Sequence, residues 1–176
     1  METKPSSEPI LNRVAASQLV SLDLESFYSE GIRSTIDLRD FLFQGIILKE
    51  KDFRDQIAKT NWSAYQDHYV AIQCTADAIV PTWAFMLLSI ALRPYARKIV
   101  FGSLSELESA LFLDALNHHD WSNYQNAKVV IKGCSKVEVP ISAYVEVTNR
   151  LKPIASSIMY GEPCSTVPLY KRPKSS

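Results

Sequence analysis

The chain has 176 residues, of which 47% are hydrophobic and 22% charged, and its 19 basic residues balance its 19 acidic ones. This composition is typical of a globular protein of about one domain and excludes a disordered chain. Because the net charge is zero, no overall field would recruit nucleic acid or an anionic membrane, and we expect neither as a partner.

The sequence predicts neither a membrane span nor a secretion signal. Its longest apolar run, residues 78–92, contains Pro81 and is too short to cross a bilayer, and the N-terminus lacks the apolar core of a signal peptide. We therefore expect a cytoplasmic protein whose three cysteines stay as free thiols in a reducing compartment.

A single α/β domain is expected over residues 10–170, between polar tails at 1–9 and 171–176. Near its start, residues 19–27 alternate apolar and polar side chains, which is typical of an edge strand, and residues 34–38 are a second candidate strand. Together they predict an N-terminal edge strand or hairpin. The following residues 40–57 are expected to be mostly helical, with an interruption at Gly45.

An internal repeat then dominates the chain. Shifted by 59 positions, residues 53–102 align with 112–161 without a gap, and sixteen of the fifty columns are identical. Trp62 and Trp121 are one such identical pair, and we expect both to serve packing. The agreement indicates an internal duplication inside one pseudo-symmetric domain.

Each copy predicts the same order of elements: helix, strand, helix, strand. The helices are expected at residues 51–59, 81–92, 105–117 and 140–151, with a capping box at residues 103–106, and the strands at 69–73, 98–101, 128–132 and 157–160. A strand–helix–strand unit places its two strands in parallel. The sequence therefore predicts a three-layer α/β sandwich around one mostly parallel sheet.

The three cysteines each follow a predicted strand. Cys74 comes directly after its strand, Cys134 follows the equivalent strand of the second copy after one intervening residue, and Cys164 lies three residues beyond the Gly161 that follows the last strand. The carboxyl ends of parallel strands meet at one edge of a sheet, beside helix N-termini that favour thiolates. We therefore expect Cys74, Cys134 and Cys164 to converge at this edge.

Three converging thiolates indicate a metal centre. They would hold an iron–sulfur cluster with one open iron, or zinc with a fourth ligand, for which Asp77 and Glu162 are candidates. The cluster is the preferred interpretation because the short C-x₂-C spacing of many zinc sites is absent. The predicted function is metal binding in cluster assembly or redox support.

Two other interpretations stay open, and the sequence specifies neither a substrate nor an oligomeric state. Free cysteines often pack as small apolar residues, so the protein would be an interaction or scaffold module with structural thiols. A thiol-dependent enzyme would need a base beside Cys74 or Cys134. However, His68, His118 and His119 are expected at the amino ends of the strands, the opposite edge from the cysteines.

Several segments resemble a bacterial family classed as a domain of unknown function. They are Asn12-Arg13-Val14, Leu42-Phe43-Gln44-Gly45, Lys51-Asp52-Phe53-Arg54, and the runs at residues 76–84, 130–135 and 159–168, of which the last, MYGEPCSTVP, is the most specific. The resemblance covers nearly the whole chain after Pro9. It implies a connection with iron–sulfur assembly, and so assembly proteins as partners, and it supplies no catalytic residue.

Overall fold

The computed structural model describes residues 19–133, 136–162 and 165–173. The chain divides into two compact units, which are treated separately below. The β3 unit comprises Phe27–His119 and Val139–Tyr144, and the β5 unit comprises Met1–Ser26, Asp120–Glu138 and Val145–Ser176.

A parallel three-stranded sheet forms the centre of the β3 unit. Its order is β2 (Arg33–Asp37), β3 (Tyr69–Gln73) and β4 (Lys98–Phe101). Helix α1 (Glu50–Lys59) connects β2 to β3, α2 (Thr82–Leu92) connects β3 to β4, and α3 (Leu104–Asn117) follows β4. Consecutive strands therefore lie side by side, as is usual for strand–helix–strand connections.

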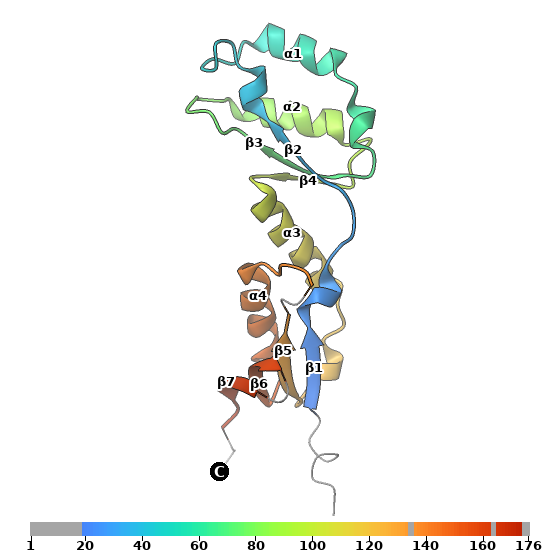
Figure 1. The fold of residues 1–176 in the computed structure, drawn as a ribbon, viewed down its shortest axis with the longest axis vertical. Coiled ribbons are helices and arrows are strands. Elements are labelled where there is room, and N and C mark those ends of the chain that lie inside the picture. The colour runs from blue at the N-terminus through green and yellow to red at the C-terminus, as the bar shows by residue number, and fades with distance from the viewer. Residues whose placement is uncertain (1–18, 134–135, 163–164, 174–176) are drawn as a thin grey trace, which may run out of the picture. The chain divides into compact units, whose positions relative to one another are not determined.

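Helices cover both faces of this sheet (Figure 1). Phe53 of α1 and Leu88 of α2 are buried in one cluster with Ile72 of β3. On the other face, Leu107 of α3 is buried against Ala71, the neighbour of Ile72 in the strand. Successive strand residues point to opposite faces, so β3 serves both cores. The β3 unit is a three-layer α/β/α sandwich, as the sequence predicted.

The β5 unit holds a four-stranded sheet in the order β1 (Leu19–Asp23), β5 (Lys128–Lys132), β6 (Ser157–Glu162) and β7 (Ser165–Lys171). The first three strands are parallel, and β7 runs antiparallel to β6. Helix α4 (Ile141–Leu151) connects β5 to β6. Val129, Val130 and Ile131 of β5 are all buried, which is typical of a central parallel strand.

Short 3₁₀ helices lie in the connections of the described chain. They are η1 (Leu24–Phe27), η2 (Leu38–Phe41), η3 (Trp62–Tyr65) and η4 (Ser122–Tyr124). Trp62 of η3 is buried and donates its indole N–H to Ile57 O at 2.8 Å. This contact supports the packing role predicted for that tryptophan.

The elements recur at the 59-residue offset seen in the sequence. β3 and β5, α2 and α4, and β4 and β6 begin at positions 59 residues apart. Two left-handed positions recur as well: Asp67 and Asn126 have φ of 63° and 58°, and Gly102 and Gly161 have φ of 125° and 119°. An internal duplication predicts such agreement, and the duplication itself stays an interpretation of the sequence.

The described strands form two sheets where the sequence predicted one. β3 and β4 lie in one sheet, and β5 and β6 lie in the other. The reason lies in the N-terminal fifty residues, because β1 pairs with β5 while β2 pairs with β3. Each repeat therefore completes its sheet with an N-terminal strand, and β1 and β2 form no hairpin with each other.

Two segments differ locally from the prediction. The region before α1 is not mostly helical: η2 ends at Phe41, and Phe43 and Ile47 then form an antiparallel bridge. Gln44 and Gly45 between them both have positive φ, 53° and 73°, which suits a tight hairpin turn and is incompatible with a helix. The second difference is β7, which the sequence did not predict.

Candidate functional site

Cys74 follows β3 at the carboxyl edge of the β3-unit sheet. Its side chain is half-buried and packs against the apolar cluster between α1, α2 and the sheet. The thiol lies 3.8 Å from Ala76 O, a contact suited to a weak S–H donor. Asp77, the predicted fourth ligand, lies exposed in the bend that follows. These features place Cys74 partly inside an apolar core.

Asp37, at the end of β2, fixes the loop that contains Cys74. Thr75 donates its N–H to Oδ1 at 3.1 Å and its hydroxyl to Oδ2 at 2.5 Å, and Arg39 N–H donates to Oδ1 at 2.9 Å. Burial by itself would raise the pKa of Asp37, but these hydrogen bonds to the charged form outweigh it and lower the pKa. Asp37 therefore acts as an ionised anchor between two strand ends.

Cys134 and Cys164 lie outside the described residues, but the strands before them are described. Each cysteine comes two positions after the last residue of its strand, Lys132 for β5 and Glu162 for β6. These two strands are parallel neighbours in one sheet. In the sequence, both cysteines therefore come shortly after strand ends that lie at the same edge of the β5-unit sheet.

Polar groups already occupy the described part of this edge. Asp23, the last residue of β1, accepts from Lys132 Nζ at 3.2 Å, and hydrogen bonding to Asp23 raises the pKa of Lys132. Glu25 in η1 accepts the backbone N–H of Lys136 at 2.9 Å, which ties the segment after β5 to η1. The edge thus combines two carboxylates with a lysine beside the positions that lead to the cysteines.

The strands that lead to the three cysteines lie in two different sheets. β3, which leads to Cys74, and β5, which leads to Cys134, belong to different sheets, so the premise of a shared edge is wrong for that pair. Among the described residues, no group of three or more His, Cys, Asp or Glu could hold a metal ion. Since Cys134 and Cys164 are outside that search, the predicted metal site stays a prediction.

His68 lies at the amino end of its strand, as the sequence predicted. The same prediction is wrong for His119, whose ring lies 4.9 Å between centroids from that of Phe27, the last residue of η1, which follows the carboxyl end of β1. His68 directly precedes β3 at the amino end of the strand, with its Nδ1 2.8 Å from Ser34 Oγ. His118 follows the last residue of α3, and its Nδ1 lies 2.7 Å from Asp114 O. His68 is therefore at the opposite end of β3 from Cys74, which disfavours a Cys–His pair there.

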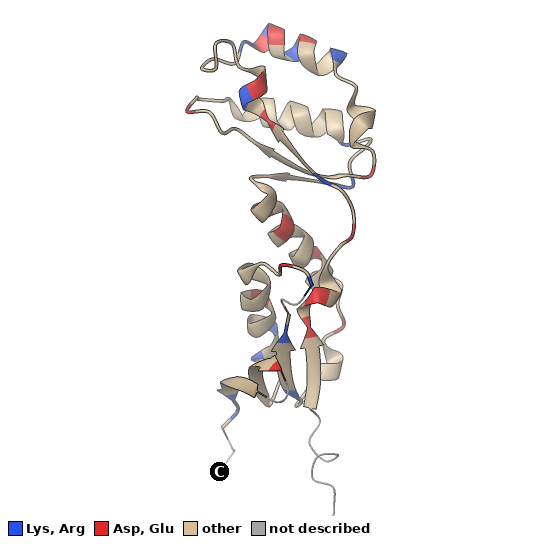
Figure 2. Cartoon of the chain, in the orientation of Figure 1, with Lys and Arg blue, Asp and Glu red and all other residues tan. Residues whose placement is uncertain are grey.

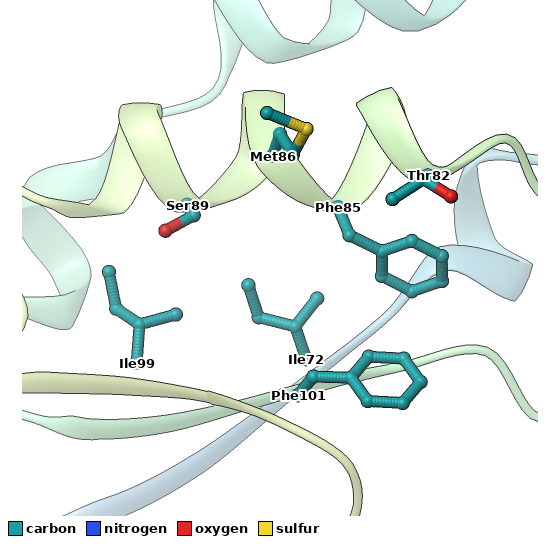
Figure 3. A pocket seen from close by; sticks show the side chains of 7 residues that line it. All are labelled: Ile72, Thr82, Phe85, Met86, Ser89, Ile99 and Phe101. Atoms are coloured by element: carbon teal, nitrogen blue, oxygen red, sulfur yellow. The ribbon is translucent and has the colours of Figure 1, made fainter.

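A pocket beside α2 was not predicted from the sequence. It measures about 420 Å³, and Figure 3 shows it between α2 and the sheet, lined by Ile72, Thr82, Phe85, Met86, Ser89, Ile99 and Phe101. The rings of Phe85 and Phe101 meet edge to face with centroids 5.2 Å apart. The sequence feature that could have indicated this pocket is the absence of charged residues from α2. Helix α1, by contrast, carries several charged residues, as Figure 2 shows.

Within the described part of the chain, no helix has the length and apolar composition needed to cross a membrane. No curated protein and no solved structure matches the chain. Residues 8–172 match the family described as "Protein of unknown function (DUF2480)". The chain therefore belongs to the DUF2480 family.

Proposed function

We propose that this protein binds a metal centre through Cys134, Cys164 and Cys74, with an iron–sulfur cluster as the first candidate and zinc as the alternative. The observation that carries the proposal is the position of Cys134 and Cys164, each two residues beyond one of two adjacent parallel strands. The carboxyl edge of a parallel sheet is where such folds bind their ligands.

The donor chemistry supports a thiophilic metal. Thiolates select zinc and iron–sulfur clusters, and cysteines from separate loops commonly bind both. The chain is charge-balanced, and Lys132 at this edge is already paired with Asp23. The proposed site would act in cluster assembly or redox support in the cytoplasm, with iron–sulfur assembly proteins as partners.

Cys74 is the weakest member of the proposed set. It follows a strand of the other sheet and packs against an apolar cluster. This packing favours a structural thiol at Cys74, so the second candidate function is an interaction module with structural cysteines. Asp77 lies in the same loop as Cys74, so the evidence for Asp77 as a metal ligand is equally weak.

The test is anaerobic purification of the full chain, followed by an absorbance spectrum and iron, sulfide and zinc analysis. We expect iron and sulfide with an absorbance band at about 400 nm, or stoichiometric zinc in a colourless protein. Cys134→Ser and Cys164→Ser should each abolish binding, whereas Ser165→Ala, which changes the neighbour of Cys164 and keeps every thiol, should not.

The variant Cys74→Ser separates the members of the set. If it keeps the full metal content, Cys74 is not a ligand and the three-thiol form of the proposal is overturned. If the wild-type protein binds neither iron nor zinc after reconstitution, metal binding as a whole is overturned. Uniformly slow alkylation of all three thiols in the folded protein would then favour structural cysteines over a reactive-thiol enzyme.

A further inference from the structure

We propose that two copies of this chain associate through strand β4, antiparallel across a twofold axis, so that two three-stranded sheets join into one of six strands. In this dimer α2 and the partner's α2 lie side by side over the joined strands. The proposal concerns the β3 unit and does not depend on metal binding.

The outer edge of β4 lacks the usual protection of an edge strand. β4 is the last strand in its sheet order, with no described strand beyond it. Its residues after Lys98 are Ile-Val-Phe, without proline or a bulge, and Lys98 itself pairs with Asp114 of α3. β7, the corresponding edge of the other sheet, has Pro168 and a register shift in its pairing, both features that discourage further strand addition.

In the β5-unit sheet, another strand occupies the position that corresponds to the outer edge of β4. β6 begins 59 residues after β4, and its outer edge pairs with the antiparallel strand β7. Ile158 and Tyr160, at the offset positions of Ile99 and Phe101, pair with Tyr170 and Val167. The β3-unit sheet has no equivalent of β7 among the described residues, and the partner's β4 would occupy that place.

The orientations of the β4 side chains restrict the registers in which two copies can pair. Ile99 and Phe101 face α2, whereas Val100 packs toward α3 with Leu107. Side chains opposite each other in an antiparallel pair point to the same face, so registers centred on Ile99, Val100 or Phe101 are allowed. The register centred on Val100 pairs Ile99 with the partner's Phe101 and leaves Lys98 outside the apolar contact, and it is the one we propose. Gly102 donates its N–H to Ile72 O, so Ile99 and Phe101 turn their backbone groups outward and can bond the partner.

Exposed apolar side chains of α2 and β4 supply part of the area that a dimer requires. Met86, Ile90 and Phe101 are 61%, 69% and 70% exposed. Aromatic side chains bury roughly 150–250 Å² each, so Phe101 alone offers on the order of 150 Å² per copy, and Met86 and Ile90 add to it. A standard interface uses about 800 Å² per partner, and the β4 backbone with the partly exposed Phe85 and Ile99 supplies further area. No charged residue of α2 opposes this contact.

The experiment is sedimentation equilibrium of the full chain over a range of concentrations. We expect a concentration-dependent dimer, whose dissociation constant rises on the order of 100-fold in Phe101→Glu, because each interface then gains two buried carboxylates. Met86→Glu should weaken it in the same direction. Ile46→Glu, at an exposed apolar residue of the same unit away from α2 and β4, is the matched control and should leave the dimer unchanged.

A cross-link tests the register itself. Opposed residues at a non-hydrogen-bonded position lie about 4.5 Å apart between Cα atoms, within the range of a disulfide. In a chain with its three cysteines changed to serine, Val100→Cys should therefore form a covalent dimer on oxidation, and Ile46→Cys should not. If that background does not fold, the glutamate variants still decide the proposal.

A monomer at every concentration would overturn the proposal, as would a dimer that Phe101→Glu leaves intact. Binding of a small apolar molecule in the pocket to a strictly monomeric chain would overturn it as well.

Discussion

Arg33 and Glu108 join the first strand of the β3-unit sheet to α3. Arg33 Nε and Nη2 donate to the two carboxylate oxygens of Glu108 at 2.6 and 3.2 Å, and Nη1 donates to Gly31 O at 2.7 Å. The guanidinium also lies 4.4 Å from the ring centroid of Tyr28 and 5.3 Å from that of Tyr69. The hydrogen bond to Glu108 raises the pKa of Arg33, so the guanidinium stays charged.

We expect Glu108→Gln to destabilise the protein by about 2 kcal/mol, because hydrogen bonds to charged groups contribute roughly 1.5–3 kcal/mol and bidentate pairs are among the strongest. The side chains of Arg33 and Glu108 are 13% and 26% exposed, so solvent screens this pair less than a surface pair. Breaking a fully buried pair would cost more, about 3–5 kcal/mol.

The assay is urea unfolding followed by far-UV circular dichroism, compared with Glu50→Gln. Glu50 pairs with Arg54 one helical turn away at 2.9 Å, and both side chains are more than half exposed, so its loss should cost only about 0.3–0.5 kcal/mol. The difference between the variants should persist in 1 M NaCl. Equal costs for Glu108→Gln and Glu50→Gln would refute the reasoning.

Three further predictions concern single residues of the fold. The pKa of Asp37 is lower in the folded than in the unfolded chain, so its stabilising contribution is complete above the unfolded value of about 3.9 and is lost as the pH falls below it. Asp37→Asn should therefore flatten the acid side of a stability–pH profile measured by urea unfolding, and parallel profiles would contradict this. Ser103→Ala removes the N-cap and capping box of α3 and should cost about 1 kcal/mol, while Ser103→Asn should recover most of it in thermal unfolding; equal losses would argue against capping. Gly161→Ala should cost about 1–3 kcal/mol and more than Gly45→Ala, because an added Cβ at Gly161 would meet Ser165 O at 2.6 Å, whereas that at Gly45 meets open space. The reverse order in denaturant unfolding would contradict the steric argument.

Short-range patterns were sufficient to locate most of the elements. The strands at residues 69–73, 98–101 and 128–132 have the bounds that their β-branched runs predicted. The capping box at Ser103 and Glu106 is present, with Glu106 accepting the Ser103 N–H at 2.7 Å. Prolines 81 and 140 directly precede α2 and α4, as expected from the preference of proline for helix starts. These signals depend on neighbours within a few positions along the chain.

The hairpin turn at Gln44 and Gly45 shows where such patterns fail. Glycine marked the interruption correctly, but the flanking residues had been assigned to a helix on composition. The bridge between Phe43 and Ile47 replaces that helix, and Lys49 Nζ lies 3.2 Å from the ring centroid of Phe43. Such contacts follow from the turn conformation and not from helical periodicity.

The residue order alone was enough to indicate an α/β chain with a 59-residue repeat and a cysteine after a strand in each copy. It did not decide the strand partners, because the choice depends on contacts between segments distant in sequence, which short-range patterns do not record. In the folded chain β1 pairs with β5 and β2 with β3, and the repeats occupy separate sheets. This long-range pairing separates the strand before Cys74 from the strands before Cys134 and Cys164, and it leaves the outer edge of β4 without a described partner.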